Sequence, residues 1–287
     1  MSWRIVIVSS RAKLDYRMDY LVVRGEEEKR VHISEIGTLI IESTAVSMTA
    51  ALLGQLADRN ITVVFCDNKR NPSCQLLPLY GVYNASKCLR NQITWTDERK
   101  TNVWTQIVRD KIYQQYCFLK ELDLPESELL NSYVNELCEG DATNREGHAA
   151  KVYFNALYGK AFKRGRDDSV NSALNYGYSI ILSAFNREIV AEGYLTQIGI
   201  FHSSEQNFFN LTCDFMEPYR IIIDRVVYAN VERPFDKDYK RILVEALNEK
   251  VTIDGKKQYI TNAIKIYVSS VFDALCGERK SILTYEF

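Results

Sequence analysis

The stretch SALNYGYSIILSAF, residues 172–185, decides the architecture of this 287-residue chain. It is apolar on nearly every side, which is typical of a helix in the centre of a helical bundle. Gly177 permits close packing there, and the polar exceptions Asn171 and Asn175 are most simply explained by a core helix with a capping asparagine. The stretch therefore predicts a central helix over residues 172–192.

Helical spacing of apolar residues continues on both sides of this stretch. The helix predicted over residues 97–122 has one stripe that comprises Val108, Ile112, Gln115, Tyr116 and Leu119. Further helices are expected over residues 126–138, 144–162, 214–229, 236–249 and 259–277. An Asp254-Gly255 turn before the last helix predicts a small β-hairpin.

The N-terminal part of the chain has the pattern of strands instead. One helix is expected over residues 47–59, and strands are expected over residues 4–10, 14–24, 29–34, 38–42 and 61–66. We interpret residues 1–84 as a domain and the polar, basic residues 85–96 as a linker. The predicted fold class is α+β: a small β-rich N-terminal domain followed by a larger all-α C-terminal domain, residues 97–287.

Composition limits the compartment and the ligands. The net charge of −1 gives no global attraction to nucleic acid, so such a surface has to be a local patch. No apolar run approaches the roughly 20 residues that span a bilayer, and the apolar part of the N-terminus is too short for a signal peptide. Seven scattered cysteines without a CxxC motif indicate free thiols in a reducing cytoplasm.

Three carboxylates and one imidazole in otherwise apolar segments form the candidate site: Glu146, His202, Asp214 and Glu217. A buried carboxylate is costly unless it is neutralised, and three beside a histidine suggest a divalent cation. Carboxylate and imidazole ligands without thiolates favour Mg²⁺ or Mn²⁺ over zinc. Such an ion can act as a Lewis acid on a phosphodiester and activate water or a hydroxyl group.

Each of these residues also has a structural explanation. Thr143-Asn-Arg-Glu146 fits a capping box, although Glu146 also lies on the apolar face of its helix. His202 follows an apolar run and fits a satisfied core or loop histidine. His148 is about 200° round the helix from Glu146 and would not share its site.

The acidic pair near residue 215 has a similar ambiguity. Asp214 and Glu217 share one helix face, as two oxygen ligands would, but they also fit an N-cap and an acid in the first turn. Arg220 and Asp224, four residues apart, most simply form an ion pair.

A local basic patch lies near the candidate site. The run KAFKRGR occupies residues 160–166, and a solvated loop explains it as well as a contact with phosphates does. The side chains that could contact nucleic-acid phosphates are Lys151, Lys160, Lys163, Arg164, Arg166 and Arg220.

Four segments in this order resemble one known family: EGHAAKVYF, NSALNYGYSIIL, GIFHS and LTCDFMEPYRIIID. The family is the CRISPR-associated integrases of spacer acquisition, the first-numbered Cas protein. The strand ITVVFCD and the late DGKKQYITNAIKIYV segment fit it too, so the resemblance covers the whole chain. The NYGY and DFMEP variants look most like members from type II-A systems.

The resemblance implies a metal-dependent DNA integrase that also has endonuclease capability. In that family the 3′-hydroxyl of a captured DNA fragment attacks a phosphodiester at the edge of the CRISPR repeat. The implied assembly is two homodimers bridged by a dimer of a small ferredoxin-like companion protein. The family's metal ligands correspond to Glu146, His202 and Glu217, with Asp214 as an alternate or supporting acid.

Two other functions stay open from the sequence alone. One is a stand-alone metal-dependent nuclease or resolvase that cuts branched DNA with water as the nucleophile. The other is a non-catalytic DNA-binding scaffold in which all four residues are caps and ion pairs.

Overall fold

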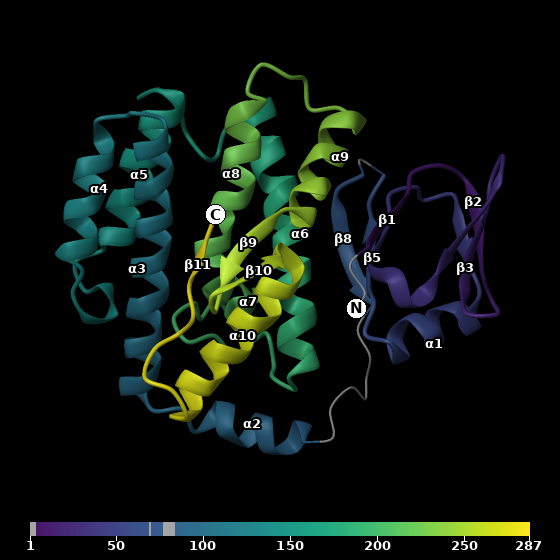
Figure 1. The fold of residues 1–287 in the computed structure, drawn as a ribbon, viewed down its shortest axis with the longest axis horizontal. Coiled ribbons are helices and arrows are strands. Elements are labelled where there is room, and N and C mark those ends of the chain that lie inside the picture. The colour runs from purple at the N-terminus through teal and green to yellow at the C-terminus, as the bar shows by residue number, and fades with distance from the viewer. Residues whose placement is uncertain (1–3, 69, 77–83) are drawn as a thin grey trace.

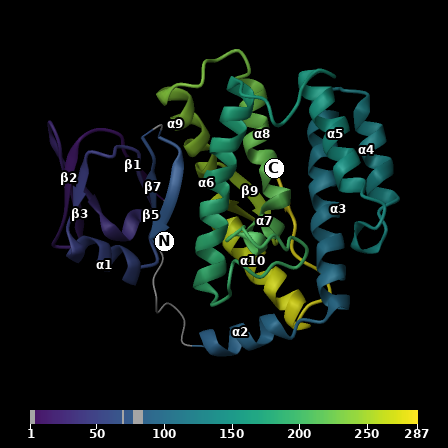
Figure 2. The same ribbon diagram turned by 180° about the vertical axis from the view of Figure 1, so that it is seen from behind.

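The computed structural model describes residues 4–68, 70–76 and 84–287. Figure 1 shows a β-rich unit at the N-terminal end beside a larger, mostly helical unit, and Figure 2 shows the same arrangement from behind. This arrangement confirms the predicted α+β fold class. The predicted domain boundary at residue 84 adjoins residues 77–83, which lie outside the described residues, so the boundary itself stays a prediction.

Two four-stranded sheets form the N-terminal unit. In the first, β5 lies between β1 and β7 and is parallel to both, while β8 is antiparallel to β7. Their bounds are Arg4–Val8 for β1, Ile36–Ile41 for β5, Thr62–Cys66 for β7 and Pro72–Leu76 for β8. Every residue of β5 is buried, as expected for the central strand of a parallel arrangement.

The second sheet has the order β4-β3-β2-β6. Its strands are β2 Ala12–Arg17, β3 Tyr20–Arg24, β4 Glu28–His32 and β6 Val46–Met48. Helix α1, Ala50–Asp58, follows Thr49, whose hydroxyl accepts a hydrogen bond from the backbone N–H of Leu52. Leu52 and Leu56 lie one turn apart on the buried face of α1 and pack in the core of this unit.

Helix α6, Ser169–Ala191, is the centre of the helical unit, as the sequence predicts. Helices α7, α8, α9 and α10 all pack against it. The helices of this unit are α2 Ala85–Ile93, α3 Asp97–Glu121, α4 Glu126–Asn135, α5 Arg145–Tyr158, α7 Asn210–Met216, α8 Arg220–Ala229, α9 Lys237–Glu245 and α10 Ile260–Cys276.

The cap of α6 differs from the prediction of an asparagine. The carboxylate of Asp168 accepts a hydrogen bond from the backbone N–H of Asn171 at 2.8 Å and closes the first turn. The side chain of Asn171 instead accepts from Arg164 and donates to the carbonyl of Lys163. The helix therefore begins three residues before the predicted residue 172, because an aspartate outside the apolar run supplies the cap.

Three further predictions need correction. The predicted linker, residues 85–96, contains helix α2, which packs because Cys88 and Gln92 lie one turn apart on a buried face. The helix predicted over 214–229 is divided into α7, a short 3₁₀ turn over Glu217–Tyr219, and α8.

The C-terminal domain is also not strictly all-α. It contains a small sheet with the order β10-β9-β11, formed by β9 Lys250–Ile253, β10 Lys256–Tyr259 and β11 Tyr285–Glu286. The turn of the predicted hairpin is confirmed at Asp254-Gly255, where both residues have positive φ. None of the helices in the described residues is both long enough and apolar enough to cross a bilayer.

Hydrogen bonds fasten the two units together along α6. Asn186 donates to the Gln75 side chain of β8 at 3.0 Å, and Arg187 donates to the backbone carbonyl of Gly37 at 2.9 Å. Asn186 also accepts from Thr212 of α7 at 3.3 Å. The N-terminal sheet is therefore linked through α6 to the helix that precedes Glu217.

Gly177 lies where α6 packs against Ile223 of α8. A Cβ atom at this position would be 2.4 Å from Cγ2 of the buried Ile223. We expect Gly177→Ala to destabilise the protein by about 1–3 kcal/mol, the usual cost of overpacking. Thermal and urea unfolding measure this loss of stability. Gly54→Ala is the matched control, because a Cβ there meets nothing within 4 Å, and it should be neutral or stabilising.

Candidate active site

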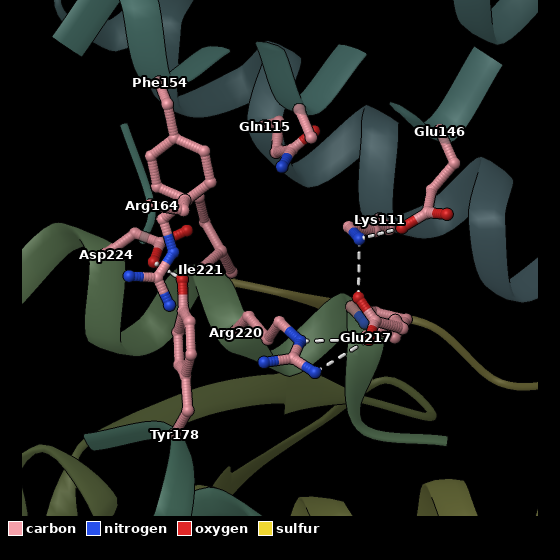
Figure 3. Close-up of a pocket in the computed structure, with 12 residues that line it drawn as sticks. Lys111, Gln115, Glu146, Phe154, Arg164, Tyr178, Glu217, Arg220, Ile221 and Asp224 are labelled. Atoms are coloured by element: carbon pink, nitrogen blue, oxygen red, sulfur yellow. Dashed lines mark hydrogen bonds and ion pairs between the residues drawn. The ribbon is translucent and has the colours of Figure 1, made fainter. Parts of the chain in front are cut away.

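The candidate active site is a cavity of about 220 Å³ between α3, α5, α6 and α8. Its polar lining side chains are Lys111, Gln115, Glu146, Arg164, Tyr178, Glu217, Arg220 and Asp224. Figure 3 shows Glu146 and Glu217 approaching the same point, the ammonium group of Lys111, from different elements. The structure thus brings together two of the predicted carboxylates.

Glu146 is free to face this cavity because another residue caps its helix. The carboxylate of Asp141 accepts hydrogen bonds from the backbone N–H groups of Arg145 at 2.6 Å and Glu146 at 3.0 Å. Asn144, in the left-handed conformation with φ 52°, precedes α5 without capping it. The capping-box explanation of Glu146 is therefore wrong, and the Oε1 atom of Glu146 accepts from Nζ of Lys111.

Glu217 is buried and accepts hydrogen bonds at both carboxylate oxygens. Lys111 donates to Oε2 at 2.5 Å, and Arg220 donates to Oε1 at 3.0 and 2.9 Å. Burial alone would raise the pKa of Glu217, but the charges of Arg220 and Lys111 outweigh it and lower the pKa to about 2. The predicted Arg220–Asp224 ion pair is wrong, because Arg220 binds Glu217 and Asp224 accepts from the hydroxyl of Tyr178.

Asp214 lies inside α7 and not at its N-cap, and it does not line the cavity. Its fully buried carboxylate accepts from the backbone N–H groups of Ile200 at 2.7 Å, Phe201 at 3.1 Å and His202 at 3.0 Å. A Cβ atom at Gly199 would be 2.7 Å from this carboxylate, so the close approach requires glycine. Asp214 therefore anchors the GIFHS loop through three backbone N–H groups.

His202 is held at one ring nitrogen. Its Nδ1 lies 2.6 Å from Oδ1 of Asp214, while its side chain is 41% exposed. The hydrogen bond to Asp214 raises the pKa of His202, burial lowers it, and the charges of Glu217 and Glu146 raise it further. His202 also makes an edge-on contact with Trp104 of α3. This arrangement leaves Nε2 as the nitrogen that can serve as a ligand.

The chemical types of the predicted donors suit a hard cation, but His202 does not line the cavity that Glu146 and Glu217 share. Within residues 4–68, 70–76 and 84–287, no three His, Cys, Asp or Glu side chains gather closely enough to hold a metal ion. Glu146 and Glu217 nevertheless share one buried cation, the ammonium of Lys111. Two oxygen ligands around a cation and an anchored imidazole are the donors that Mg²⁺ or Mn²⁺ accepts.

The predicted phosphate-binding residues divide into two groups. Lys151, Lys160, Lys163 and Arg166 are exposed on α5 and the segment after it. Arg164 and Arg220 are partly buried instead, and each guanidinium lies over the ring of Tyr178, at 5.5 and 4.7 Å from its centroid. Arg164 also donates to Asn171 and Asn175.

Sequence reasoning missed Lys111, although a signal for it existed. Lys111 lies three residues after Val108 and four before Gln115, so it falls on the apolar stripe recognised in the helix over 97–122. A lysine on a buried stripe needs an acidic partner, and the structure supplies two. Asp141 was missed because it lies before the Thr143–Glu146 motif, and Tyr178 because its apolar helix gives no sign that its hydroxyl bonds Asp224.

Fold and site together define an α+β protein in which two carboxylates, Glu146 and Glu217, share one buried cation. The family model for CRISPR associated protein Cas1 matches residues 5–261. The chain is 33% identical to the CRISPR-associated endonuclease Cas1 of Neisseria meningitidis serogroup C (strain 8013), over 94% of this chain and 91% of that protein. The chain therefore belongs to the Cas1 family of CRISPR-associated proteins, which confirms the family predicted from the sequence.

Solved structures share the fold. A casposase bound to integration product has a TM-score of 0.77 at 19% identity, over 98% of this chain and 92% of that one. A chain of a Cas6-RT-Cas1–Cas2 complex has a TM-score of 0.74 at 16% identity, over 97% of this chain and 35% of that one.

Proposed function

We propose that this protein is a metal-dependent DNA integrase of CRISPR adaptation that also has endonuclease activity. The observation that carries the proposal is the convergence of Glu146 and Glu217 on one buried cation. Family membership supports the CRISPR context, the Neisseria relative is named an endonuclease, and the casposase of similar fold was solved with an integration product.

The reaction is a transesterification. The 3′-oxygen of a captured DNA fragment forms a bond to phosphorus in the CRISPR repeat, and the bond from that phosphorus to the 3′-oxygen of the repeat strand breaks. The proton of the attacking hydroxyl ends on the leaving oxygen, so the number of phosphodiesters does not change. With water as the nucleophile the same site would cut DNA.

The residues of the site have distinct roles in this proposal. Glu146, Glu217 and Nε2 of His202 would hold Mg²⁺ or Mn²⁺, which supplies Lewis-acid stabilisation of the charge on the attacked phosphate. Asp214 fixes the orientation of His202 and accepts a hydrogen bond from its Nδ1–H group. The proton therefore stays on Nδ1, and the lone pair of Nε2 is available to the metal ion. Arg220 holds Glu217 in place.

DNA and a companion protein are the proposed partners. The Cas6-RT-Cas1–Cas2 complex, which contains a chain of this fold, supports a small companion protein, for which we propose a ferredoxin-like fold. We further propose two homodimers in each integration complex and a cytoplasmic location, where CRISPR DNA is present. The seven cysteines, all free in the structure, suit a reducing compartment.

The exposed basic residues after α5 should contribute salt-dependent DNA affinity. We expect the triple change Lys160→Gln, Lys163→Gln and Arg166→Gln to weaken DNA binding at low salt. The slope of log K against log[salt] should become shallower by up to about 0.9 for each DNA phosphate that the variant no longer neutralises. Fluorescence anisotropy of labelled DNA over a salt series measures this slope. The change Lys256→Gln, on the exposed hairpin strand β10, is the control; an unchanged slope in the triple variant would assign DNA binding to other residues.

A strand-joining assay tests the function itself. Purified protein, its companion and Mn²⁺ or Mg²⁺ are incubated with a labelled fragment and a repeat-containing target. Joined products indicate integration, and cut strands alone indicate the stand-alone nuclease. We expect Glu146→Ala and His202→Ala to abolish joining; normal joining by both variants would refute the site.

A further inference from the structure

Lys111 occupies the position that the proposed metal would need. Its side chain, on α3 between the buried residues Ile107 and Ile112, is 10% exposed, and Nζ donates to both Glu146 and Glu217 (Figure 3). An ammonium group this deeply buried is tolerated only with charged partners. The two carboxylates therefore hold Lys111, and Lys111 in turn cancels their mutual repulsion.

The charges of the site already balance, so an additional cation is unfavourable there. The two carboxylates, Glu146 and Glu217, are balanced by the two cations that bind them, Lys111 and Arg220, so the group is neutral. A divalent ion added to this neutral group would leave two uncompensated positive charges in a mostly buried place, which is strongly unfavourable. If the ammonium moves out from between the carboxylates into the adjoining cavity, which opens to solvent, the excess at the carboxylates falls to one charge, which a DNA phosphate can balance.

The distances lead to the same conclusion. The ammonium nitrogen lies within hydrogen-bond reach of Oε1 of Glu146 and 2.5 Å from Oε2 of Glu217. Mg²⁺ binds carboxylate oxygens at about 2.0–2.1 Å, so an ion shared by the same two oxygens would overlap Nζ. The ion and the ammonium group therefore exclude each other between the two carboxylates.

The displaced ammonium has a place to go. The cavity of about 220 Å³ lies directly beside it, and Gln115, one turn further along α3, lines the same cavity. Oε1 of Gln115 is buried and has no hydrogen-bond partner among the residues described by the structure. A buried acceptor without a partner is costly, and a lysine ammonium moved into the cavity would satisfy it once the Gln115 side chain turns its oxygen toward the cavity.

We propose that Lys111 is a resident cation that regulates metal loading of this site. It holds Glu146 and Glu217 in position without metal, competes with the incoming divalent ion, and moves into the cavity toward Gln115 as the ion binds. The inference rests on the proposed metal-dependent function and adds a competing step to it. Because a DNA phosphate offsets the remaining charge, metal binds more tightly with DNA present than without it.

Mn²⁺ binding, measured from the electron paramagnetic resonance signal of the free aqua ion, tests the competition directly. We expect Lys111→Met, which keeps the length of the side chain and removes its charge, to bind Mn²⁺ at least about tenfold more tightly than wild type. In EDTA the variant should unfold at a lower temperature, and Mn²⁺ should raise its midpoint more than that of wild type. Lys120→Met, an exposed position on the same helix that bonds Tyr116, is the control and should match wild type.

A second measurement uses the wild-type protein and does not depend on the variant folding. Reductive methylation followed by mass spectrometry reports the accessibility of each lysine. We expect modification of Lys111 to be slow in EDTA and severalfold faster with saturating Mn²⁺, with Lys120 unchanged.

The outcomes separate the two proposals. If Glu217→Gln removes Mn²⁺ binding but Lys111→Met leaves the affinity unchanged, the metal site stands and the competing role of Lys111 is wrong. If Mn²⁺ leaves the methylation rate of Lys111 unchanged in a protein that binds the ion, displacement is likewise wrong. If neither wild type nor Lys111→Met binds Mn²⁺ with or without DNA, the proposed function and the inference both fail.

Discussion

Glu217→Gln is expected to reduce strand joining at least about a thousandfold, well beyond the 10- to 100-fold cost typical of a residue that only supports a metal ligand. Glutamine keeps the shape of the side chain but removes the charge that would bind the ion. It also leaves Lys111 and Arg220, both bound to this carboxylate, without their shared partner. Breaking a buried ion pair from one side costs about 3–5 kcal/mol, so the variant should also unfold at a lower temperature.

Loss of the fold has to be separated from loss of the site in this variant. Joining is therefore measured well below the unfolding midpoint of the variant, alongside Mn²⁺ binding by the folded protein. Glu121→Gln is the matched control: it removes an acid from α3 that pairs with Arg225 but is 52% exposed, so the change should cost at most about 1 kcal/mol. A folded Glu217→Gln protein that joins DNA at the wild-type rate would exclude Glu217 as a ligand.

The helical architecture was predictable because its signal is local. Apolar periodicity over the 172–192 segment and over 97–122 reflects burial of one face or of the whole helix, and the structure places both helices there. The ends of elements depend on residues outside the periodic run. The carboxylate of Asp168 caps the N-terminus of α6, and that of Asp141 caps the N-terminus of α5. Neither aspartate belongs to the apolar pattern that identifies its helix.

The site was predictable in part, since two of its carboxylates lie on apolar faces. The sequence places Lys111 on a buried helix stripe, but it could not reveal that this lysine pairs with Glu146 and Glu217, because they are distant from it in the chain. Thr143-x-x-Glu146 shows the corresponding risk: the motif is present, but the carboxylate of Asp141 accepts from the backbone N–H of Glu146 that the hydroxyl of Thr143 would have bonded. Local motifs indicate the possible partners of a residue, and tertiary packing selects among them.

Asp214→Asn should show how much the buried anchor of the GIFHS loop contributes. In the wild-type protein both carboxylate oxygens accept: Oδ2 from the N–H groups of Ile200 and Phe201, and Oδ1 from the N–H of His202 and its ring. An asparagine places an NH₂ group against some of these donors and leaves them unpaired. Each buried donor left without an acceptor costs about 1–3 kcal/mol, so the loop and the fold both lose stability.

The same change should alter the imidazole itself. If the amide NH₂ faces Nδ1 of His202, that nitrogen has to accept, and the proton moves to Nε2, which can then no longer donate a lone pair to a metal ion. We expect joining to fall about 10- to 100-fold and Mn²⁺ affinity to fall with it. Nitrogen-15 NMR of the ring reports the tautomer directly. Asp236→Asn, at the N-cap of α9, is the matched control because asparagine caps a helix about as well as aspartate. If Asp214→Asn lowers the unfolding temperature but leaves the tautomer and the Mn²⁺ affinity unchanged, Asp214 only stabilises the loop.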